Sequence, residues 1–186
     1  MRKIEEKDQP FLSAHLFEKR NAELHRQSSS AYEALFRLHG EMLGDAPVRR
    51  ILYQMSGKPY FEGGYPYFSL SHTEGMSLAV MSLSFEVGAD IESLQAAREK
   101  GKASAYRALA ERMFFREELE TLSVAATDEE FLSAFLSVYT QKEALAKLLT
   151  VPVMQINTQK PPKEVSVETT CTDCGAYIYS VAFRRK

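Results

Sequence analysis

Apolar side chains recur at helical spacing in two long stretches of the sequence. In the first, "SSSAYEALFRLHGEMLG", Ser30 and Glu33 form the capping-box pattern that starts many helices, and Gly44 marks a stop. The apolar positions that share one face of this stretch are Ala31, Leu35, Leu38 and Met42. The second stretch, "TDEEFLSAFLSVYTQKEALAKLL", opens with another capping box at Thr127 and Glu130. We therefore expect an amphipathic helix in each place.

Shorter apolar runs have the composition of strands. Between Gly57 and Glu92, aromatic and β-branched residues are interrupted by glycine and proline, which predicts three short strands ending near Glu92. Residues 94–122 are helical in pattern with a weak point near Gly101, and the charged N-terminal stretch also has a helical pattern. After a proline-rich loop at 158–164, "EVSVE" and "AYIYSVAF" alternate on either side of "TDCG", as in an antiparallel hairpin. This order predicts an α+β sandwich.

Length and composition favour one compact soluble unit. The chain has 186 residues, of which 45% are hydrophobic and 26% charged, within the ordinary range for globular proteins. Its formal charge is -2, so it has no overall basic field, and we expect neither nucleic acid nor a membrane as a partner. The charged start lacks the apolar core of a signal peptide, and no later run is long enough to span a membrane, which points to the cytoplasm.

The two cysteines form a single C-x-x-C motif. Cys171 and Cys174 stand in "CTDCG", without the second pair that would make a zinc knuckle persuasive. We interpret them as a reduced hairpin tip.

Two acidic residues end the predicted strand "VGADIES". Asp90 and Glu92 are two positions apart, so on a strand their side chains point to the same face and their charges repel. Such a pair persists either because it lies in water or because a cation sits between its oxygens. The sequence at this point leaves both interpretations open.

A third carboxylate interrupts the apolar face of the second helix. The stripe Leu132, Leu136, Tyr139 continues at helical spacing to Glu143, which should therefore face inward. The alternative is a solvated pair of Glu143 with Lys147 four residues on, worth about 0.2–0.5 kcal/mol. Together with Asp90 and Glu92, an inward Glu143 would make a set of oxygen ligands suited to Mg²⁺ and a phosphate-bearing ligand.

Groups that can donate to phosphate oxygens lie just upstream. Lys58 in "GKPYF" and Ser71 with His72 in "SLSHT" are of this kind. Each has an ordinary alternative, because Lys58 can simply solvate the turn before Pro59 and a histidine is more often a structural hydrogen-bonding group.

Read in order, "GKPYF", "FSLSHTEG", "VGADIE", "MFFREE" and "YTQKEALAK" resemble the motif series of the 4′-phosphopantetheinyl transferases, of the surfactin-synthetase-activator (Sfp-like) type. The resemblance runs from about Gly57 to Lys147, and its most specific parts are the D-x-E of Asp90 and Glu92 and the K-E-A-x-x-K that ends at Lys147. It implies a single domain over 1–186 with two similar α+β lobes, about 1–87 and 88–186. The active site would lie in the cleft between the lobes, and one chain would suffice as a monomer.

The resemblance also implies an activity: Mg²⁺-dependent transfer of the 4′-phosphopantetheine arm from coenzyme A to a serine of an apo acyl or peptidyl carrier protein. Adenosine 3′,5′-bisphosphate would be released. The implied Mg²⁺ ligands are Asp90, Glu92 and Glu143, and the implied coenzyme A contacts are Lys58, Ser71, His72 and Lys142. Lys147 would neutralise charge on the leaving phosphate.

Other roles are less directly implied. A carboxylate has to accept the serine proton; the candidates are Glu118 in "FFREE" and Glu143, with Glu118 favoured and Glu117 its alternative by register. Arg26 in "LHRQ" is a substitute for the basic residues that the family usually carries near its start. This chain departs from the family pattern at Tyr139, where tryptophan is usual, and at Ala89, where a branched residue is usual.

Two further functional hypotheses compete. A binding module could hold coenzyme A or a carrier protein without turnover, although the intact acidic and lysine positions favour the transferase. A hydrolase with Ser71 as nucleophile ranks last, because no G-x-S-x-G surrounds it and no acid is placed to orient His72.

Overall fold

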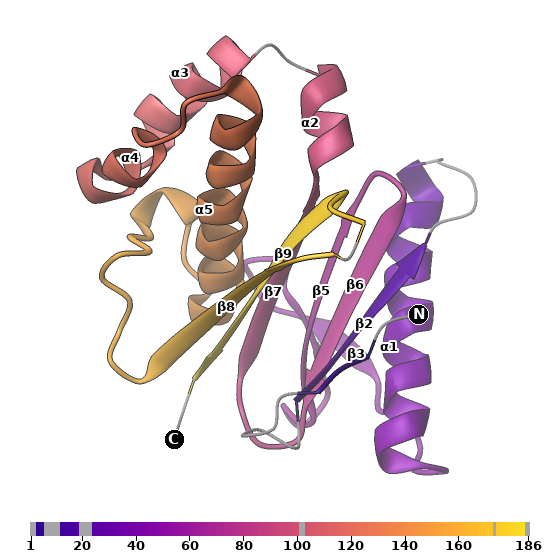
Figure 1. The fold of residues 1–186 in the computed structure, drawn as a ribbon. Helices are drawn as coiled ribbons and strands as arrows, with labels where there is room; N and C mark the ends of the chain where they lie inside the picture. The colour runs from indigo at the N-terminus through magenta and orange to yellow at the C-terminus, as the bar shows by residue number, and fades with distance from the viewer. Residues whose placement is uncertain (1–2, 6–11, 19–23, 101–102, 173, 185–186) are drawn as a thin grey trace.

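A computed structural model describes residues 3–5, 12–18, 24–100, 103–172 and 174–184 and shows an α+β fold (Figure 1). The strands are β1 (Lys3–Glu5), β2 (Leu12–Glu18), β3 (Ile51–Tyr53), β4 (Pro59–Phe61), β5 (Tyr67–Thr73), β6 (Met76–Ser82), β7 (Val87–Ser93), β8 (Val165–Cys171) and β9 (Tyr177–Arg184). The helices are α1 (Leu24–Leu43), α2 (Leu94–Lys100), α3 (Ala103–Met113), α4 (Arg116–Leu122), α5 (Asp128–Leu149) and the 3₁₀ turn η1 (Val153–Gln155). In these ranges, no helix has both the length and the apolar composition needed to cross a membrane.

The N-terminal part is an antiparallel sheet covered by α1. Its strands lie in the order β1-β2-β6-β5, and α1 packs across β2, β6 and β5. The apolar face of α1, with Leu35 and Leu38 fully buried, meets Phe68 and Met81 of the sheet. The small β3–β4 hairpin adds Phe61 to the same core, so its turn is held close to the edge strand β5.

The C-terminal part is a second antiparallel sheet covered by α5. Its order is β7-β9-β8, and Ala144, Leu145 and Leu148 of α5 pack against it together with Val165 and Ala182. The first half of α5 extends beyond the sheet, where α2, α3 and α4 gather around the buried ring of Phe135. Leu136, on the same half of α5, belongs to this helical core.

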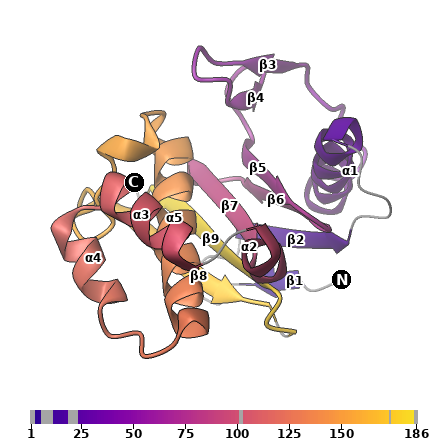
Figure 2. The ribbon, with the colours of Figure 1, turned by 90° about the horizontal axis from the view of Figure 1, so that it is seen from above.

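The two sheets meet between α1 and α5, as Figure 2 shows. Leu78 and Val80 of β6 pack against Val87, Ala89 and Ile91 of β7 in one buried cluster, and β5 lies beside β7. Strands from distant parts of the sequence therefore run next to each other under the C-terminal half of α5.

Several expectations from the sequence are confirmed. Helix α5 begins after the predicted capping box, in which the Thr127 hydroxyl accepts from the Glu130 amide at 3.1 Å. The described residues of 94–122 form α2, α3 and α4, whereas the weak point predicted near Gly101 lies outside the described residues. Strands β8 and β9 form the predicted antiparallel hairpin. That the molecule consists of two similar lobes divided near residue 87 stays a prediction.

Other expectations are wrong. The N-terminal stretch is not helical where it is described: β1 and β2 are strands, and β2 pairs with β6 along its whole length. Helix α1 begins at Leu24, ahead of the capping box predicted at Ser30. The Ser30 hydroxyl, which was predicted to cap the helix, lies 2.6 Å from the hydroxyl of Ser77 on β6 and forms a tertiary hydrogen bond with it. The segment from Gly57 to Glu92 contains β4, β5, β6 and β7 rather than three strands.

Candidate functional site

Gly88 allows strand β7 to approach α5 closely. A Cβ atom at Gly88 would lie 2.1 Å from the carbonyl oxygen of Ala144 and 2.6 Å from the amide nitrogen of Leu148. Glycine alone lacks this atom, so it permits the strand and the helix backbone to touch. Asp90 and Glu92 follow at alternate positions of the same strand and therefore share the face that meets α5.

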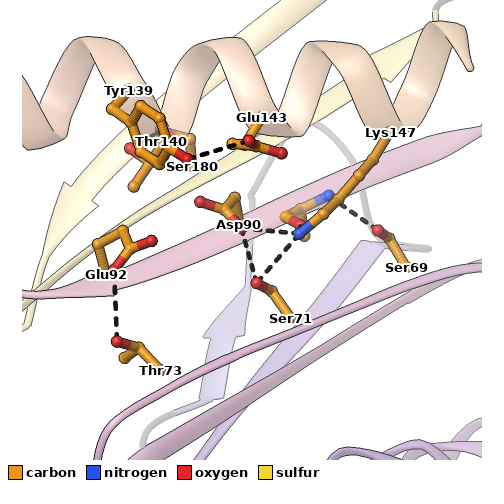
Figure 3. A network of polar contacts seen from close by, with 11 residues as sticks. Ser69, Ser71, Thr73, Asp90, Glu92, Tyr139, Thr140, Glu143, Lys147 and Ser180 are labelled. Carbon is orange, nitrogen blue, oxygen red and sulfur yellow. Dashed lines mark hydrogen bonds and ion pairs between the residues drawn. The ribbon is translucent and has the colours of Figure 1, made fainter. Parts of the chain in front are cut away.

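Asp90 is the centre of a polar network that joins β5, β7 and α5 (Figure 3). The Lys147 amine of α5 donates to Asp90 Oδ1 at 2.7 Å, and the Ser71 hydroxyl of β5 donates to the same oxygen at 2.7 Å. The Lys147 amine also donates to Ser71 Oγ at 3.1 Å and to the carbonyl of Ala89 at 3.0 Å. The Asp90 side chain is 7% exposed and that of Lys147 is 29% exposed, so the pair lies at the floor of the site.

The other oxygen of Asp90 is buried without a partner. Asp90 Oδ2 has no hydrogen bond to any group in the described part of the chain. A buried carboxylate oxygen of this kind is destabilising unless something else binds it. The geometry thus leaves one strong acceptor available to a ligand or ion.

Glu92 and Glu143 lie on either side of Asp90. Burial, followed by the charge of Asp90, raises the pKa of Glu92 to about 7. Burial and Asp90 likewise raise the pKa of Glu143, whose Oε1 accepts from the Tyr139 hydroxyl at 3.2 Å. Glu92 and Glu143 are thus harder to ionise than ordinary glutamates, first because they are buried and then because the charge of Asp90 lies nearby.

Alternate hydroxyl groups of β5 face β7, a feature that sequence analysis did not predict as a set. Ser69 Oγ accepts from the Ala89 amide at 2.9 Å, and Thr73 Oγ1 donates to Glu92 Oε2 at 3.4 Å. With Ser71 between them, the three hydroxyls follow the two-residue period of a strand. The alternation in "FSLSHT" was the available signal, but only the neighbouring strand shows what the hydroxyls bind.

The network forms one wall of a cleft of about 440 Å³. The cleft is bounded by α1, the β3–β4 hairpin, β5, β7 and α5, and it is lined by Asp90, Glu92, Glu143, Lys147, Ser71 and His72. His72 is exposed. At the outer wall, the hydroxyls of Tyr32 and Tyr53 are hydrogen-bonded at 2.8 Å. The structure therefore brings most of the predicted site residues to one cavity.

Lys58 lies in two further cavities that continue this cleft. The first of these, of about 390 Å³, shares Glu143 and Lys147 with the cleft. The other, of about 370 Å³, shares Lys58 with the 390 Å³ cavity and includes Arg184. The Lys58 amine donates to the Val87 carbonyl at 2.9 Å, and burial lowers its pKa to about 8. We call the three cavities together the groove.

The structure does not bring Glu118 and Lys142 to the groove. Both side chains are 0% exposed and form an ion pair at 2.7 Å. The Lys142 amine also donates to the Ile156 carbonyl, and Glu118 accepts from the amides of Phe115 and Thr158 and from the Thr158 hydroxyl. Both oxygens of Glu118 are thereby engaged, and the pair joins α4, α5 and the segment after η1.

Two other predicted residues lie elsewhere. Glu117 is on the outer side of α4, where it pairs with Lys160. Arg26 lies in the first turns of α1, and its side chain falls outside the described part of the chain. Cys171 and Cys174 are exposed at the β8–β9 turn.

The carboxylates fit a hard cation by chemistry, although they do not surround one. In the described residues, no three His, Cys, Asp or Glu side chains are arranged as a metal-binding group. The Lys147 amine supplies the positive charge next to Asp90. The unpartnered Asp90 Oδ2 and the raised pKa values of its neighbours are what a magnesium ion would relieve.

Residues 86–175 match the family model of the 4′-phosphopantetheinyl transferase superfamily. This segment of the chain is therefore a domain of that superfamily, and it includes Asp90, Glu92, Glu143 and Lys147. No curated protein matches the chain. Lys58 and Ser71, which also line the groove, lie outside the matched segment.

Proposed function

We propose that the protein transfers the 4′-phosphopantetheine arm of coenzyme A to a serine of an apo acyl or peptidyl carrier protein, in the manner of the Sfp-like type. The observation that carries the proposal is the meeting of Asp90, Glu143 and Lys147 in one cleft of a superfamily domain. Asp90, Glu92 and Glu143 would hold Mg²⁺, which when bound supplies positive charge to the diphosphate.

The reaction joins the carrier serine to the phosphorus that bears the pantetheine chain. The serine Oγ forms the new O–P bond while the bond from that phosphorus to the bridging oxygen breaks, and adenosine 3′,5′-bisphosphate leaves. Lys147, whose amine points into the cleft, stabilises the negative charge that develops on the leaving phosphate. Lys58, further along the groove, and His72, in the cleft itself, contact phosphate oxygens.

The serine proton goes to a carboxylate that the cleft exposes. Glu143 suits this role because its carboxylate lines the cleft beside Lys147, with the Tyr139 hydroxyl as its neighbour. Glu118 was favoured from the sequence, but both of its oxygens accept hydrogen bonds within the protein. We therefore propose Glu118 and Lys142 as positioning residues that hold α4 against α5.

The test is incubation with coenzyme A, Mg²⁺ and an apo carrier protein, followed by intact mass measurement. The carrier should gain one phosphopantetheine arm, and adenosine 3′,5′-bisphosphate should appear in equal amount. A carrier whose acceptor serine is replaced by alanine should gain nothing. The Asp90→Asn variant should retain its fold and lose turnover.

A non-catalytic binding module is the alternative, and one observation favours it. The described carboxylates do not form a metal-binding group, so a protein of this geometry could bind coenzyme A without activating it. An unchanged carrier mass, together with measurable coenzyme A binding, would establish the module instead of the transferase.

A further inference from the structure

A row of three polar side chains crosses the C-terminal sheet at the level of Asp90. Asp90 of β7 is directly opposite Ser180 of β9 in the strand pairing, and Ser180 is directly opposite Thr169 of β8. Side chains at directly opposed positions point to the same face of a sheet. Because Asp90 lies on the face that meets α5, Ser180 and Thr169 lie on that face as well. The row therefore leads from the acidic cluster to β8 on the α5 side of the sheet.

Hydroxyl groups connect this row to α5. The Ser180 hydroxyl lies 2.8 Å from Thr140 Oγ1 of α5 (Figure 3), and it lies 2.9 Å from Thr169 Oγ1. The Thr140 hydroxyl donates to the carbonyl of Ser137 at 3.2 Å. Since each hydroxyl has one proton to donate, Ser180 donates to Thr140, and Thr169 donates to Ser180. The three hydroxyls thus form a chain of hydrogen bonds from β8 through β9 into α5.

The apolar contact of α5 with the sheet leaves a need for such a chain. At the closest approach α5 presents Ala144, and the strands present Gly88 and Ala182, which are opposite each other. Side chains this small offer little shape by which one element can interlock with another, so the contact resists separation more than it resists rotation of the helix about its axis. A hydrogen bond, in contrast, depends on both distance and angle. The hydroxyl chain therefore restricts the orientation of α5.

The spacing along α5 links that orientation to Glu143. Thr140, Glu143 and Lys147 are three and four residues apart, so their side chains follow one another on one face of the helix. Thr140 is bonded to the residue opposite Asp90, and Lys147 is bonded to Asp90 itself. At the roughly 5–6 Å radius of helical side chains, a rotation of about 10° moves a carboxylate by about 1 Å. Glu143 would shift by that amount if the Thr140 end were released.

We propose that Thr140 and Ser180 are positioning residues, which set the rotation of α5 so that Glu143 stands beside Asp90. This inference rests on the proposed function, because it takes Asp90 and Glu143 as ligands of Mg²⁺. Thr140 and Ser180 are both fully buried, so they act through Glu143 and not by binding a ligand themselves.

The first test measures Mn²⁺ binding by electron paramagnetic resonance, without coenzyme A or carrier. Thr140→Val keeps the shape of the side chain and removes its hydroxyl, and it should weaken Mn²⁺ binding by about tenfold, as the loss of a group that orients a metal ligand does. Ser180→Ala should have the same effect. Thr140→Ser, which retains a hydroxyl, should bind Mn²⁺ as the unaltered protein does.

Ser82→Ala is the matched control, because it also removes a fully buried hydroxyl. Ser82 lies on β6 and accepts from the amides of Ser84 and Phe85, away from α5. This variant should unfold at a lower urea concentration than the unaltered protein, and it should change neither Mn²⁺ affinity nor the rate of transfer. A loss of Mn²⁺ affinity in Ser82→Ala equal to that in Thr140→Val would show that destabilisation alone explains the effect and would overturn the inference.

A double variant tests whether the two hydroxyls act through one bond. Thr140→Val combined with Ser180→Ala should bind Mn²⁺ no more weakly than either single variant, because the first substitution already breaks the connection. Additive losses would contradict a shared role. A loss in Thr140→Ser as large as that in Thr140→Val would contradict the role of the hydroxyl.

Crystal structures of the metal-free variants test the geometry directly. In Thr140→Val the Glu143 carboxylate should be displaced from Asp90, and an unchanged placement would overturn the inference whether or not metal binds. If the unaltered protein binds Mn²⁺ and transfers the arm while the variants behave like Ser82→Ala, only this inference fails. If the unaltered protein neither binds Mn²⁺ nor modifies a carrier, the proposed function fails, and the crystal structures still decide whether Thr140 and Ser180 position Glu143.

Discussion

At the scale of single residues, Lys147 binds one oxygen of Asp90, whose other oxygen has no partner among the described residues. Its amine lies 2.7 Å from Asp90 Oδ1 and is fixed there by Ser71 and the Ala89 carbonyl. A single positive charge about 4 Å from a divalent ion repels that ion by roughly 8 kcal/mol at an effective dielectric constant of about 20. The lysine therefore stabilises the acidic cluster without metal and opposes the metal's entry.

This competition predicts opposite effects of Lys147→Gln on binding and turnover. Metal affinity, measured as Mn²⁺ binding by electron paramagnetic resonance, should rise by about tenfold because part of the repulsion is removed. Transfer to the carrier should fall by about 10²–10³ because a stabilising charge is lost. Lys163→Gln, at an exposed position, is the control and should alter neither value. Weaker Mn²⁺ binding in Lys147→Gln would show that the amine supports the metal site.

Glu92 predicts a pH dependence of stability with a defined sign. Its pKa of about 7 in the folded protein lies above the ordinary glutamate value, so folding favours the protonated form. The unfavourable charge is absent at low pH, appears as the pH rises from about 4.5 to 7, and is fully present above pH 7.

The Glu92→Gln variant should therefore be more stable than the unaltered protein at pH 8 by about 2 kcal/mol, and no more stable near pH 4.5. Urea unfolding in the presence of a chelator measures both values. Glu111→Gln, at an exposed position of α3, should show no such difference. A gain of the same size at both pH values would rule out ionisation as the cause.

These residues also show how far the sequence predicts the site. The strand period placed Asp90 and Glu92 on one face, and the helical stripe placed Glu143 inward, because both rules act within a single element. The ion pair of Asp90 with Lys147 joins residues 57 positions apart, and no local rule reports it. The same limit applies to Lys142, whose motif position suggested a ligand contact although its side chain is fully buried against Glu118.

At the scale of elements, the contact of β7 with α5 depends on Gly88. A methyl group there would meet the α5 backbone, which cannot move aside as a flexible side chain can. Gly88→Ala should therefore lower the free energy of unfolding by about 1–3 kcal/mol and weaken metal and coenzyme A binding by separating Asp90 from Lys147.

Gly40→Ala provides the matched comparison. Gly40 lies within α1 with nothing within 4 Å of an added Cβ, so alanine should stabilise the protein by up to about 1 kcal/mol. Thermal or urea unfolding measures both substitutions. Equal stability of Gly88→Ala and the unaltered protein would mean that β7 and α5 are less closely packed than described.

The Glu118–Lys142 pair makes a prediction about α4 and α5. Removing either partner leaves a buried charge uncompensated, so Glu118→Gln and Lys142→Met should each cost about 3–5 kcal/mol of stability. The double variant should recover much of that loss. Folded Glu118→Gln should transfer the arm at close to the normal rate per folded molecule. A folded variant with turnover lowered by about 10²–10⁴ would instead identify Glu118 as the base.

Helices and strands were predicted well where a local sequence pattern determines them, and poorly where contacts with a neighbouring element determine them. The box at Thr127 and Glu130 caps α5 by itself, so the sequence located that start. The similar box at Ser30 does not cap α1, because the Ser30 hydroxyl is hydrogen-bonded to that of Ser77 on β6 and the helix already begins at Leu24. Strand β2 exists through its pairing with β6, a partner that the charged N-terminal pattern does not reveal.

At the scale of the whole molecule, the site belongs to both sheets. The superfamily match covers residues 86–175, yet Ser71 and Lys58 reach the groove from β5 and the β3–β4 hairpin. A ligand in the groove would therefore contact segments that are far apart in the sequence. Its binding would stabilise the N-terminal and the C-terminal sheet together.

Hydrogen exchange measures that joint stabilisation. Coenzyme A with Mg²⁺ should slow amide exchange in the turn at residues 54–58 and in the C-terminal half of α5 together, because both line the groove. Adenosine 3′,5′-bisphosphate, which is the nucleotide part of coenzyme A, should protect the same two segments. Protection confined to residues 86–175 would mean that the ligand binds the superfamily segment without the N-terminal sheet, and that the groove described by Lys58 is not its binding site.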